Sequence, residues 1–215
     1  MKLKVDHYRG RGKKRTYDIL MFPDVKNAWT YDDYPEESGP RVDGDRELFR
    51  LLKVALALLT SDPSKILYFP IKHEGYHAIY QTTYHLVLLR PELQFRRSEW
   101  FELKGKLNKR HWVGKHVIRY NEQKLLDYYE KKLKGRLWLE QEQEKYYVEE
   151  ILGDAVFMVL LKENCYRYHQ MIANSDIVTG EQRDGLNEPS NYVGIGWVLS
   201  DKVISEMRKD RPSPA

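Results

Sequence analysis

The sequence predicts an α+β protein, with a strand-rich N-terminal region that contains one buried helix and a mainly helical C-terminal region. Three patterns support this fold class: alternating apolar residues near the N-terminus, apolar residues at helical spacing over 45–60, and a long helical pattern over 137–173. Of the 215 residues, 41% are hydrophobic and 13% aromatic, which is enough for a sizeable core. We therefore expect a strand-rich basic region, 1–120, and a mainly helical region, 121–215.

The first region begins with a predicted hairpin. Residues 3–7 and 17–21 have strand-like apolar spacing and flank a basic, glycine-broken stretch, 9–15, so we expect a hairpin with a basic tip. Residues 23–44 are rich in Asp, Pro, Gly and Tyr without a period, which predicts an irregular acidic loop. A helix over 45–60 follows, and apolar residues cover so much of its circumference that we expect it to be central.

Further elements are predicted along the rest of the chain. Residues 66–71 and 76–89 favour two strands, joined by a polar turn, and 91–120 favours short strands or turns. Asn121 can cap a helix that ends near residue 134. A long helix over 137–173 is expected after it.

The sequence favours a soluble, cytoplasmic protein without a membrane-spanning part. The longest apolar stretch, 51–59, contains Lys53 and is much shorter than the roughly 20 residues that a spanning helix needs. The basic N-terminus lacks the apolar core of a secretory signal. Cys165 is the only cysteine, which excludes an internal disulfide and a cysteine-cluster zinc site.

The charge distribution points to nucleic acid as a partner. Residues 1–20 carry seven Lys or Arg against two acids, and residues 90–119 carry nine against three. Acidic blocks at 24–47, with eight acids, and 140–154, with six, complete a polarised pattern. Basic segments attract phosphate backbones through counterion release, although the same cations could instead pair with the acidic blocks of the chain itself.

Aromatic residues interleave with these cations, so bases could stack on them while the cations follow the backbone. The candidate nucleic-acid-binding residues are cations and tryptophans of the two basic segments: Arg9, Arg11, Lys13, Lys14, Arg15, Arg96, Arg97, Trp100, Lys104, Lys109, Arg110 and Trp112. Such aromatics also serve protein interfaces, so a protein-interaction or inhibitor module stays an alternative, with a protein partner.

One candidate metal site is a histidine pair. The letters His73-Glu74-Gly75-Tyr76-His77 resemble the H-E-x-x-H motif of the zinc peptidases, in which two histidines on one helical face bind zinc and the glutamate is the general base. The resemblance implies a zinc-dependent hydrolase that uses His73, Glu74 and His77. Gly75 and the strand pattern that follows instead favour a polar hairpin turn.

A second candidate metal site is a pair of carboxylates, Glu150 and Asp154. On a helix these residues share a face, so they could hold magnesium through oxygen ligands. The segment 149–157 resembles the signature helix of ribonuclease III and is similar to the acidic helix of the MazG-type nucleotide pyrophosphatases. This resemblance implies a magnesium-dependent phosphodiesterase or nucleotide pyrophosphatase. A solvated acidic helix face is the simpler alternative.

The leading hypothesis is a nucleic-acid-associated binding protein that uses its basic, aromatic-rich surface segments. Whether the chain is an enzyme, and whether it uses magnesium, zinc or no cofactor, stays open at this level.

Overall fold

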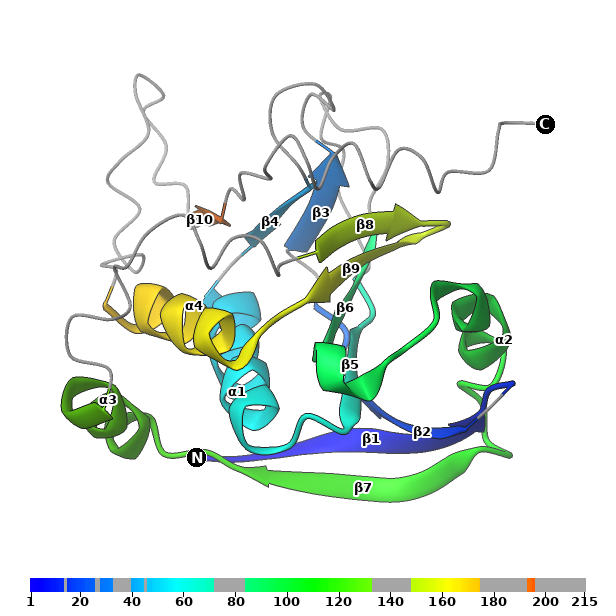
Figure 1. Ribbon diagram of the computed structural model, residues 1–215, viewed down its shortest axis with the longest axis horizontal. Helices are drawn as coiled ribbons and strands as arrows, with labels where there is room; N and C mark the ends of the chain where they lie inside the picture. The colour runs from blue at the N-terminus through cyan, green and yellow to red at the C-terminus, as the bar shows by residue number, and fades with distance from the viewer. Residues whose placement is uncertain are drawn as a thin grey trace.

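The centre of the fold is a seven-stranded mixed sheet with the strand order β7-β1-β2-β5-β6-β9-β8 (Figure 1). The structure is a computed structural model, and it describes residues 1–13, 15–25, 28–32, 40–44, 46–71, 84–132, 148–174 and 193–195. The strands of the sheet are β1 (Lys2–Arg11), β2 (Thr16–Met21), β5 (Lys65–Phe69), β6 (His85–Leu89), β7 (Trp112–Arg119), β8 (Val148–Leu152) and β9 (Ala155–Val159). Because helices pack against a mixed sheet, the predicted α+β class is confirmed.

The sheet combines hairpins with two parallel pairs. β1 pairs antiparallel with β2 and with β7, and β8 pairs antiparallel with β9. β2 runs parallel to β5, and β6 runs parallel to β9. A parallel pair needs a crossover connection, and the helix α1 (Arg46–Ser61) lies in the connection from β2 to β5.

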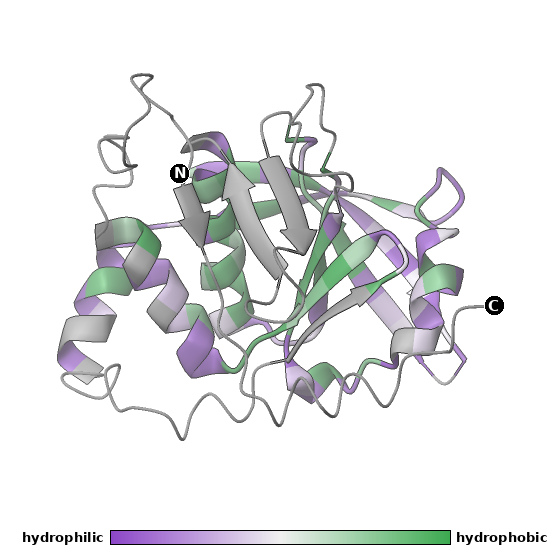
Figure 2. Cartoon of the chain, turned by 90° about the horizontal axis from the view of Figure 1, so that it is seen from above, coloured by the Kyte–Doolittle hydropathy of each residue, from purple (hydrophilic) through white to green (hydrophobic). Residues whose placement is uncertain are grey.

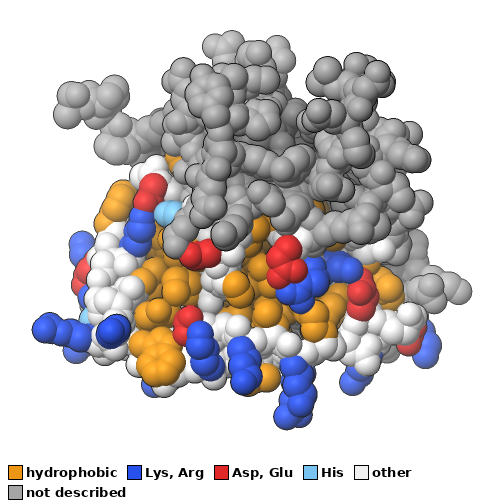
Figure 3. Space-filling view, turned by 180° about the vertical axis from the view of Figure 1, so that it is seen from behind, with side chains coloured by type: hydrophobic (Ala, Val, Ile, Leu, Met, Phe, Trp, Pro, Cys, Tyr) orange, Lys and Arg blue, Asp and Glu red, His pale blue; other side chains and the backbone are white. Residues whose placement is uncertain are grey.

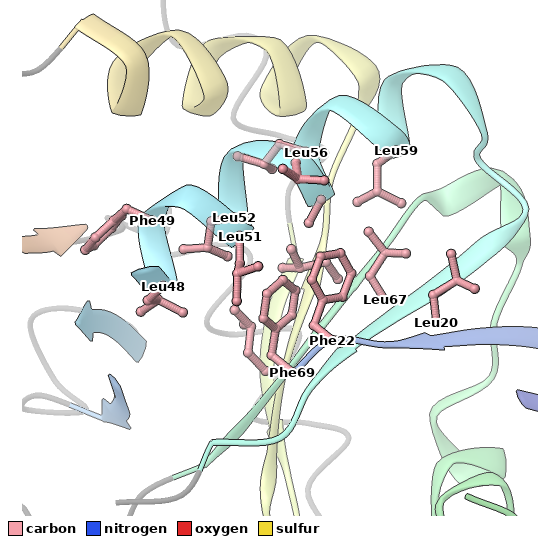
Figure 4. Packing of buried hydrophobic residues seen from close by; sticks show 14 of the residues in the cluster. Leu20, Phe22, Leu48, Phe49, Leu51, Leu52, Leu56, Leu59, Leu67 and Phe69 are labelled. Carbon is pink, nitrogen blue, oxygen red and sulfur yellow. The ribbon is translucent and has the colours of Figure 1, made fainter. Parts of the chain in front are cut away.

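The helix α1 supplies most of the core on one face of the sheet. Its buried residues face strand residues that include Leu20, Leu67 and Phe69, while α4 (Lys162–Asn174) packs beside it (Figure 4). The predicted central helix is therefore confirmed. Phe22 stacks on Phe69 with ring centroids 4.2 Å apart, so aromatic packing continues the core beyond the end of β2.

A second core lies on the opposite face of the sheet, under the short helix α2 (Trp100–Lys104). Strand residues alternate between the two faces, so that Leu67 joins the α1 core whereas its neighbour Ile66 joins the α2 core. The central strands and α1 are mainly hydrophobic, whereas the hairpin tip is mainly hydrophilic (Figure 2). No helix among the described residues is long and apolar enough to cross a membrane.

Two predictions about elements are wrong. The irregular loop predicted over 23–44 contains β3 (Ala28–Asp32) and β4 (Pro40–Gly44), which pair antiparallel with each other; β4 also pairs with β10 (Val193–Ile195). Pairing between strands, and not a pattern within the segment, creates this small sheet.

The long helix predicted over 137–173 is also wrong, because the hairpin of β8 and β9 occupies 148–159; of the residues described in this range, only those of α4 are helical. Gly153 adopts the positive φ of 63° that turns the hairpin. Residues 155–158 are all buried, and such a continuous apolar run has no period that separates a buried strand from a helix. β8 and β9 thus join the same sheet as the N-terminal strands.

The short strands or turns predicted over 91–120 are only partly right, because this range contains the helix α2 (Trp100–Lys104) and the eight-residue strand β7. Other predictions hold where the structure describes them. The hairpin of β1 and β2 is confirmed, as are β5 and the helix α3 (Glu122–Lys132). Asn121 caps α3, since its Oδ1 accepts a hydrogen bond from the backbone N–H of Lys124 at 3.1 Å. β6 is confirmed as the end of the predicted strand 76–89, whereas residues 72–83 lie outside the described residues.

A buried histidine makes the stability of the fold depend on pH. His169 in α4 is fully buried, and its Nε2 shares a hydrogen bond of 2.6 Å with the hydroxyl of Tyr120. Burial, with a smaller contribution from the charge of Lys53, lowers the pKa of His169 to about 4 against the opposing charge of Glu122. His169 is therefore neutral in the folded protein at pH 7.

We expect the free energy of unfolding to fall as the pH decreases from about 6.5 to about 4, because the unfolded chain then binds a proton that the folded chain excludes. This component amounts to about 3 kcal/mol at most. Urea unfolding at several pH values measures it, with His169→Phe as the comparison. The variant is less stable at pH 7, and its deficit shrinks towards pH 4; a deficit that stays constant would contradict the assignment.

Candidate nucleic-acid interface

The fold brings the two basic segments predicted from the sequence together. The backbone N–H of Arg9 donates to the carbonyl of His111 at 2.9 Å, and Tyr8 lies opposite Trp112 in the pairing of β1 with β7. The ammonium group of Lys106 donates to the carbonyl of Arg11. The tip of the first hairpin thus packs against the segment that links α2 to β7 (Figure 1).

We call the resulting surface the basic face. Its members are the cations of the hairpin tip and of the segment between α2 and β7: Arg9, Arg11, Lys13, Arg15, Lys106, Lys109 and Arg110. Figure 3 shows Lys and Arg side chains along the lower margin of the molecule, with hydrophobic side chains beside them.

Three cations of the basic face are held by the protein itself. Arg9 forms an ion pair of 3.0 Å with Asp18, and Lys106 forms one of 2.7 Å with Glu102. Arg15 donates to two neutral oxygens instead, the carbonyl of Leu93 at 2.8 Å and Oε1 of Gln94 at 3.2 Å. Arg15 is therefore fixed in position without loss of its charge.

The other four cations, Arg11, Lys13, Lys109 and Arg110, have exposed side chains that form no ion pair within the described part of the chain. Arg96 is exposed as well. Its charge, like that of Arg15, acts on Tyr17, which indicates that Arg96 lies near this surface. Uncompensated cations at the surface create the positive potential that attracts a polyanion.

A buried carboxylate lies beneath the hairpin tip. Glu99 is fully buried, and it approaches Gly12 so closely that a Cβ atom on that glycine would lie 2.6 Å from Oε2 of Glu99. Burial and the neighbouring Glu99 carboxylate raise the pKa of the Tyr17 hydroxyl to about 12, although Arg15 and Arg96 oppose the shift. The tip therefore packs closely on a buried acidic residue.

A second carboxylate, Asp18 on β2, gathers several cationic side chains. It accepts hydrogen bonds from His7 at 2.8 Å, Arg9 at 3.0 Å and Lys65 at 3.0 Å. Although burial opposes its ionisation, these hydrogen bonds hold the pKa of Asp18 well below its ordinary value. This cluster was not predicted from the sequence, because it depends on the hairpin register that places Arg9 opposite Asp18.

Trp112 is the exposed aromatic residue of the predicted set. Its side chain is 48% exposed, and its indole N–H donates to Oδ1 of Asp6 at 2.8 Å. Lys115 also binds Asp6, at 2.7 Å, and hydrogen bonds from these two residues lower the pKa of that carboxyl despite its burial. The indole is thus oriented through its edge while much of the ring stays accessible.

The predicted role of Trp100 is wrong. Its side chain is fully buried, and it packs at right angles on Phe157 with ring centroids 5.2 Å apart, so no base can stack on it. A tryptophan beside cations looks the same in the sequence whether it lies in the core or on the surface. Lys104 is half-buried and forms an ion pair with Asp154, so it is held away from an external phosphate.

Two predicted contacts are not described at the level of their side chains. The backbone of Arg97 begins a 3₁₀ turn, Arg97–Glu99, but its side chain lies outside the described part of the structure. Lys14 lies outside the described residues altogether.

The prediction that Glu150 and Asp154 share one face of a helix and could hold magnesium there is wrong. Glu150 lies on β8 and Asp154 in the turn after it, so the two do not share a helix face. Asp154 is engaged by Lys104, and one of its oxygens lies 3.8 Å from Nε2 of His85. Among the residues that the structure describes, no group of three or more His, Cys, Asp or Glu is placed to hold a metal ion. The zinc candidates His73, Glu74 and His77 lie outside these residues.

We expect Gly12→Ala to destabilise the protein by about 1–3 kcal/mol, because the new methyl group would collide with Glu99 and with the ring of Tyr17, 2.8 Å away. Gly105→Ala is the matched control, since its nearest contact would be an ordinary 3.6 Å and its φ is −60°. Urea unfolding of both variants checks this. Equal stability of the two variants would show that the tip does not rest on Glu99.

No protein-family model, no curated protein and no solved structure matches the chain, so these comparisons identify no family.

Proposed function

We propose that the protein binds nucleic acid through the basic face. The observation that carries the proposal is that two basic segments, separated by most of the strand-rich region in sequence, form one surface around the contact of Arg9 with His111. Arg11, Lys13, Lys109 and Arg110 have no ion pair within the described ranges, so they are available to phosphate groups.

The chemistry of this surface suits a phosphate backbone more than a particular base sequence. Lys and Arg side chains at an exposed tip neutralise phosphates and release counterions, which stabilises complexes with any sequence. The helices α2 and α3 lie at opposite ends of β7 (Figure 1), and neither belongs to the basic face. The proposed binding therefore needs no helix in a major groove.

Trp112 favours unpaired nucleotides as the target. It lies where β7 begins, two residues after Arg110, with its ring accessible. An exposed indole next to cations can stack on an unpaired base while the cations follow the backbone. Duplex DNA and duplex RNA offer such a ring only their end base pairs, so we expect single strands to bind more tightly.

The exposed apolar residues of β7 are better explained by this function than by a purely apolar protein interface. Val113 and Val117 are 51% and 44% exposed, but Val113 lies three residues after Arg110, an exposed cation that forms no ion pair within the described residues. A positive field thus accompanies the apolar surface, as binding to a polyanion requires.

Arg11→Ala and Arg110→Ala are each expected to weaken binding to oligonucleotides of all sequences by a similar factor, because each removes a phosphate contact and no base contact. Each lost contact should reduce the slope of log affinity against log salt concentration by about 0.7 for single strands. Fluorescence anisotropy with labelled single-stranded DNA and RNA, at several salt concentrations, measures both effects.

Lys131→Ala is the matched control, since it removes one exposed cation on α3, at the far end of β7 from the basic face. Its affinity and salt slope should equal those of the unmodified protein. The proposal fails if no oligonucleotide binds at low salt, or if the control weakens binding as much as Arg11→Ala does.

Trp112→Ala should cost single-strand binding about 1–3 kcal/mol through lost stacking, with little change in the salt slope because no charge is removed. Trp112→Phe should retain much of the affinity, since a phenyl ring can still stack. The same anisotropy titrations with a single strand and with its duplex distinguish stacking from charge. An equal loss on both would contradict the preference for unpaired bases.

A further inference from the structure

A groove lies at the other end of β7, away from the basic face. It has a volume of about 860 Å³, within the range typical of small-molecule sites, and it is bounded by α1, α3 and the end of β7. In Figure 1 these elements surround the N-terminus, whereas α2 and the hairpin tip lie at the opposite end of the sheet. The groove is therefore separate from the proposed nucleic-acid interface.

Most of the groove surface is apolar and aromatic. The floor is formed by side chains of α1, β7 and α3, namely Val54, Ala57, Leu58, Ile118 and Leu125. Tyr128 is 40% exposed and stacks on Tyr166 with ring centroids 5.6 Å apart and planes inclined by 28°. A flat apolar molecule could extend this stack, because the ring of Tyr128 keeps an accessible face.

The charged residues that line the groove are all cations. Lys2, Arg119 and Lys124 have exposed side chains, and none of them forms an ion pair within the described part of the chain. Not one Asp or Glu is among the lining residues that the structure describes. Positive charges around an apolar floor, without negative charges among them, attract an anion and repel a cation.

Two acids next to the lining residues are already paired with cations outside the groove. Glu122, beside Asn121, forms an ion pair of 2.5 Å with Lys53. Asp62, beside Ser61, lies 3.7 Å from the ammonium group of Lys65. Asp127, beside Tyr128, accepts a hydrogen bond from the neutral amide of Gln123 at 2.9 Å and keeps its charge, and the charge of Glu163 acts on Tyr166, but neither acid lines the groove. Within the described part of the chain, Lys2, Arg119 and Lys124 form no ion pair with any of these acids, which favours an external anion.

From this geometry we infer that the groove binds a small organic anion with a flat apolar body, such as an aromatic carboxylate or a nucleoside monophosphate. The body lies on Tyr128 and the apolar floor, and the anionic group meets Arg119, Lys124 and Lys2. This site does not depend on the proposed function, because none of its cations belongs to the basic face.

Titration with 2-naphthoate and with its uncharged isostere 2-naphthamide tests the inference, since the two share a ring system and differ in charge. Isothermal titration calorimetry on the full chain should show one site for the carboxylate, with an affinity about tenfold higher than that for the amide. Equal affinities, or no binding of the carboxylate, would overturn the inference.

Substitutions in and outside the groove test whether the probes bind there. Arg119→Ala combined with Lys124→Ala should remove most of the preference for the carboxylate, whereas the controls Lys131→Ala and Arg110→Ala should leave it unchanged. Ala57→Trp, which fills the floor, should abolish binding of both probes. If the double variant binds 2-naphthoate as tightly as the unmodified protein, the groove is not the site.

Competition with AMP identifies the source of the anion. Displacement of 2-naphthoate by AMP indicates a nucleotide ligand, and binding of 2-naphthoate without such displacement indicates a carboxylate; either result supports the anionic site. Loss of AMP competition in Arg119→Ala/Lys124→Ala, with oligonucleotide binding intact, separates this site from the basic face.

Discussion

The antiparallel pairing of β1 with β7 is the constraint on which both candidate sites depend. At one end of this ladder Tyr8 lies opposite Trp112, next to the cations of the basic face. At the other end Lys2 lies opposite Arg119, at the mouth of the groove. Backbone hydrogen bonds between residues far apart in sequence thus fix the spacing of two surfaces of positive charge.

The two cores hold this ladder in place. β1 pairs with β2 on its other side, and β2 and β5 carry side chains into the α1 core and the α2 core alternately. Because a shift of one residue would exchange the two faces, burial on both sides fixes the register of the hairpin. The register in turn places Arg9 opposite Asp18 and Arg11 opposite the uncharged Thr16.

The chain contains nearly as many acids as bases, so what distinguishes its surfaces is which cations have partners. Asp18 engages Arg9, His7 and Lys65, and Asp6 engages Lys115. Where such a pair is exposed, as that of Arg9 with Asp18 is, it adds little stability. The main effect of these pairs is to concentrate uncompensated positive charge at the tip and at the groove, where polyanions and small anions are the proposed ligands.

The sequence alone determined the local features that depend on neighbouring residues. Helical spacing predicted α1, the Asn121 cap predicted α3, and alternation around a basic stretch predicted the first hairpin, because caps, turns and amphipathic periods are set by residues a few positions apart. The clustering of cations in two segments was likewise visible.

Only the tertiary structure decided which strands pair and which side chains are buried. The buried run of β9 resembles a helix in the sequence, and the sheet that surrounds it is absent from any local pattern. Trp100 and Trp112 both stand among cations, yet the core encloses one and the edge strand exposes the other. That the two basic segments share one face also follows from pairing across many residues, since the free energy of such contacts depends on the whole fold.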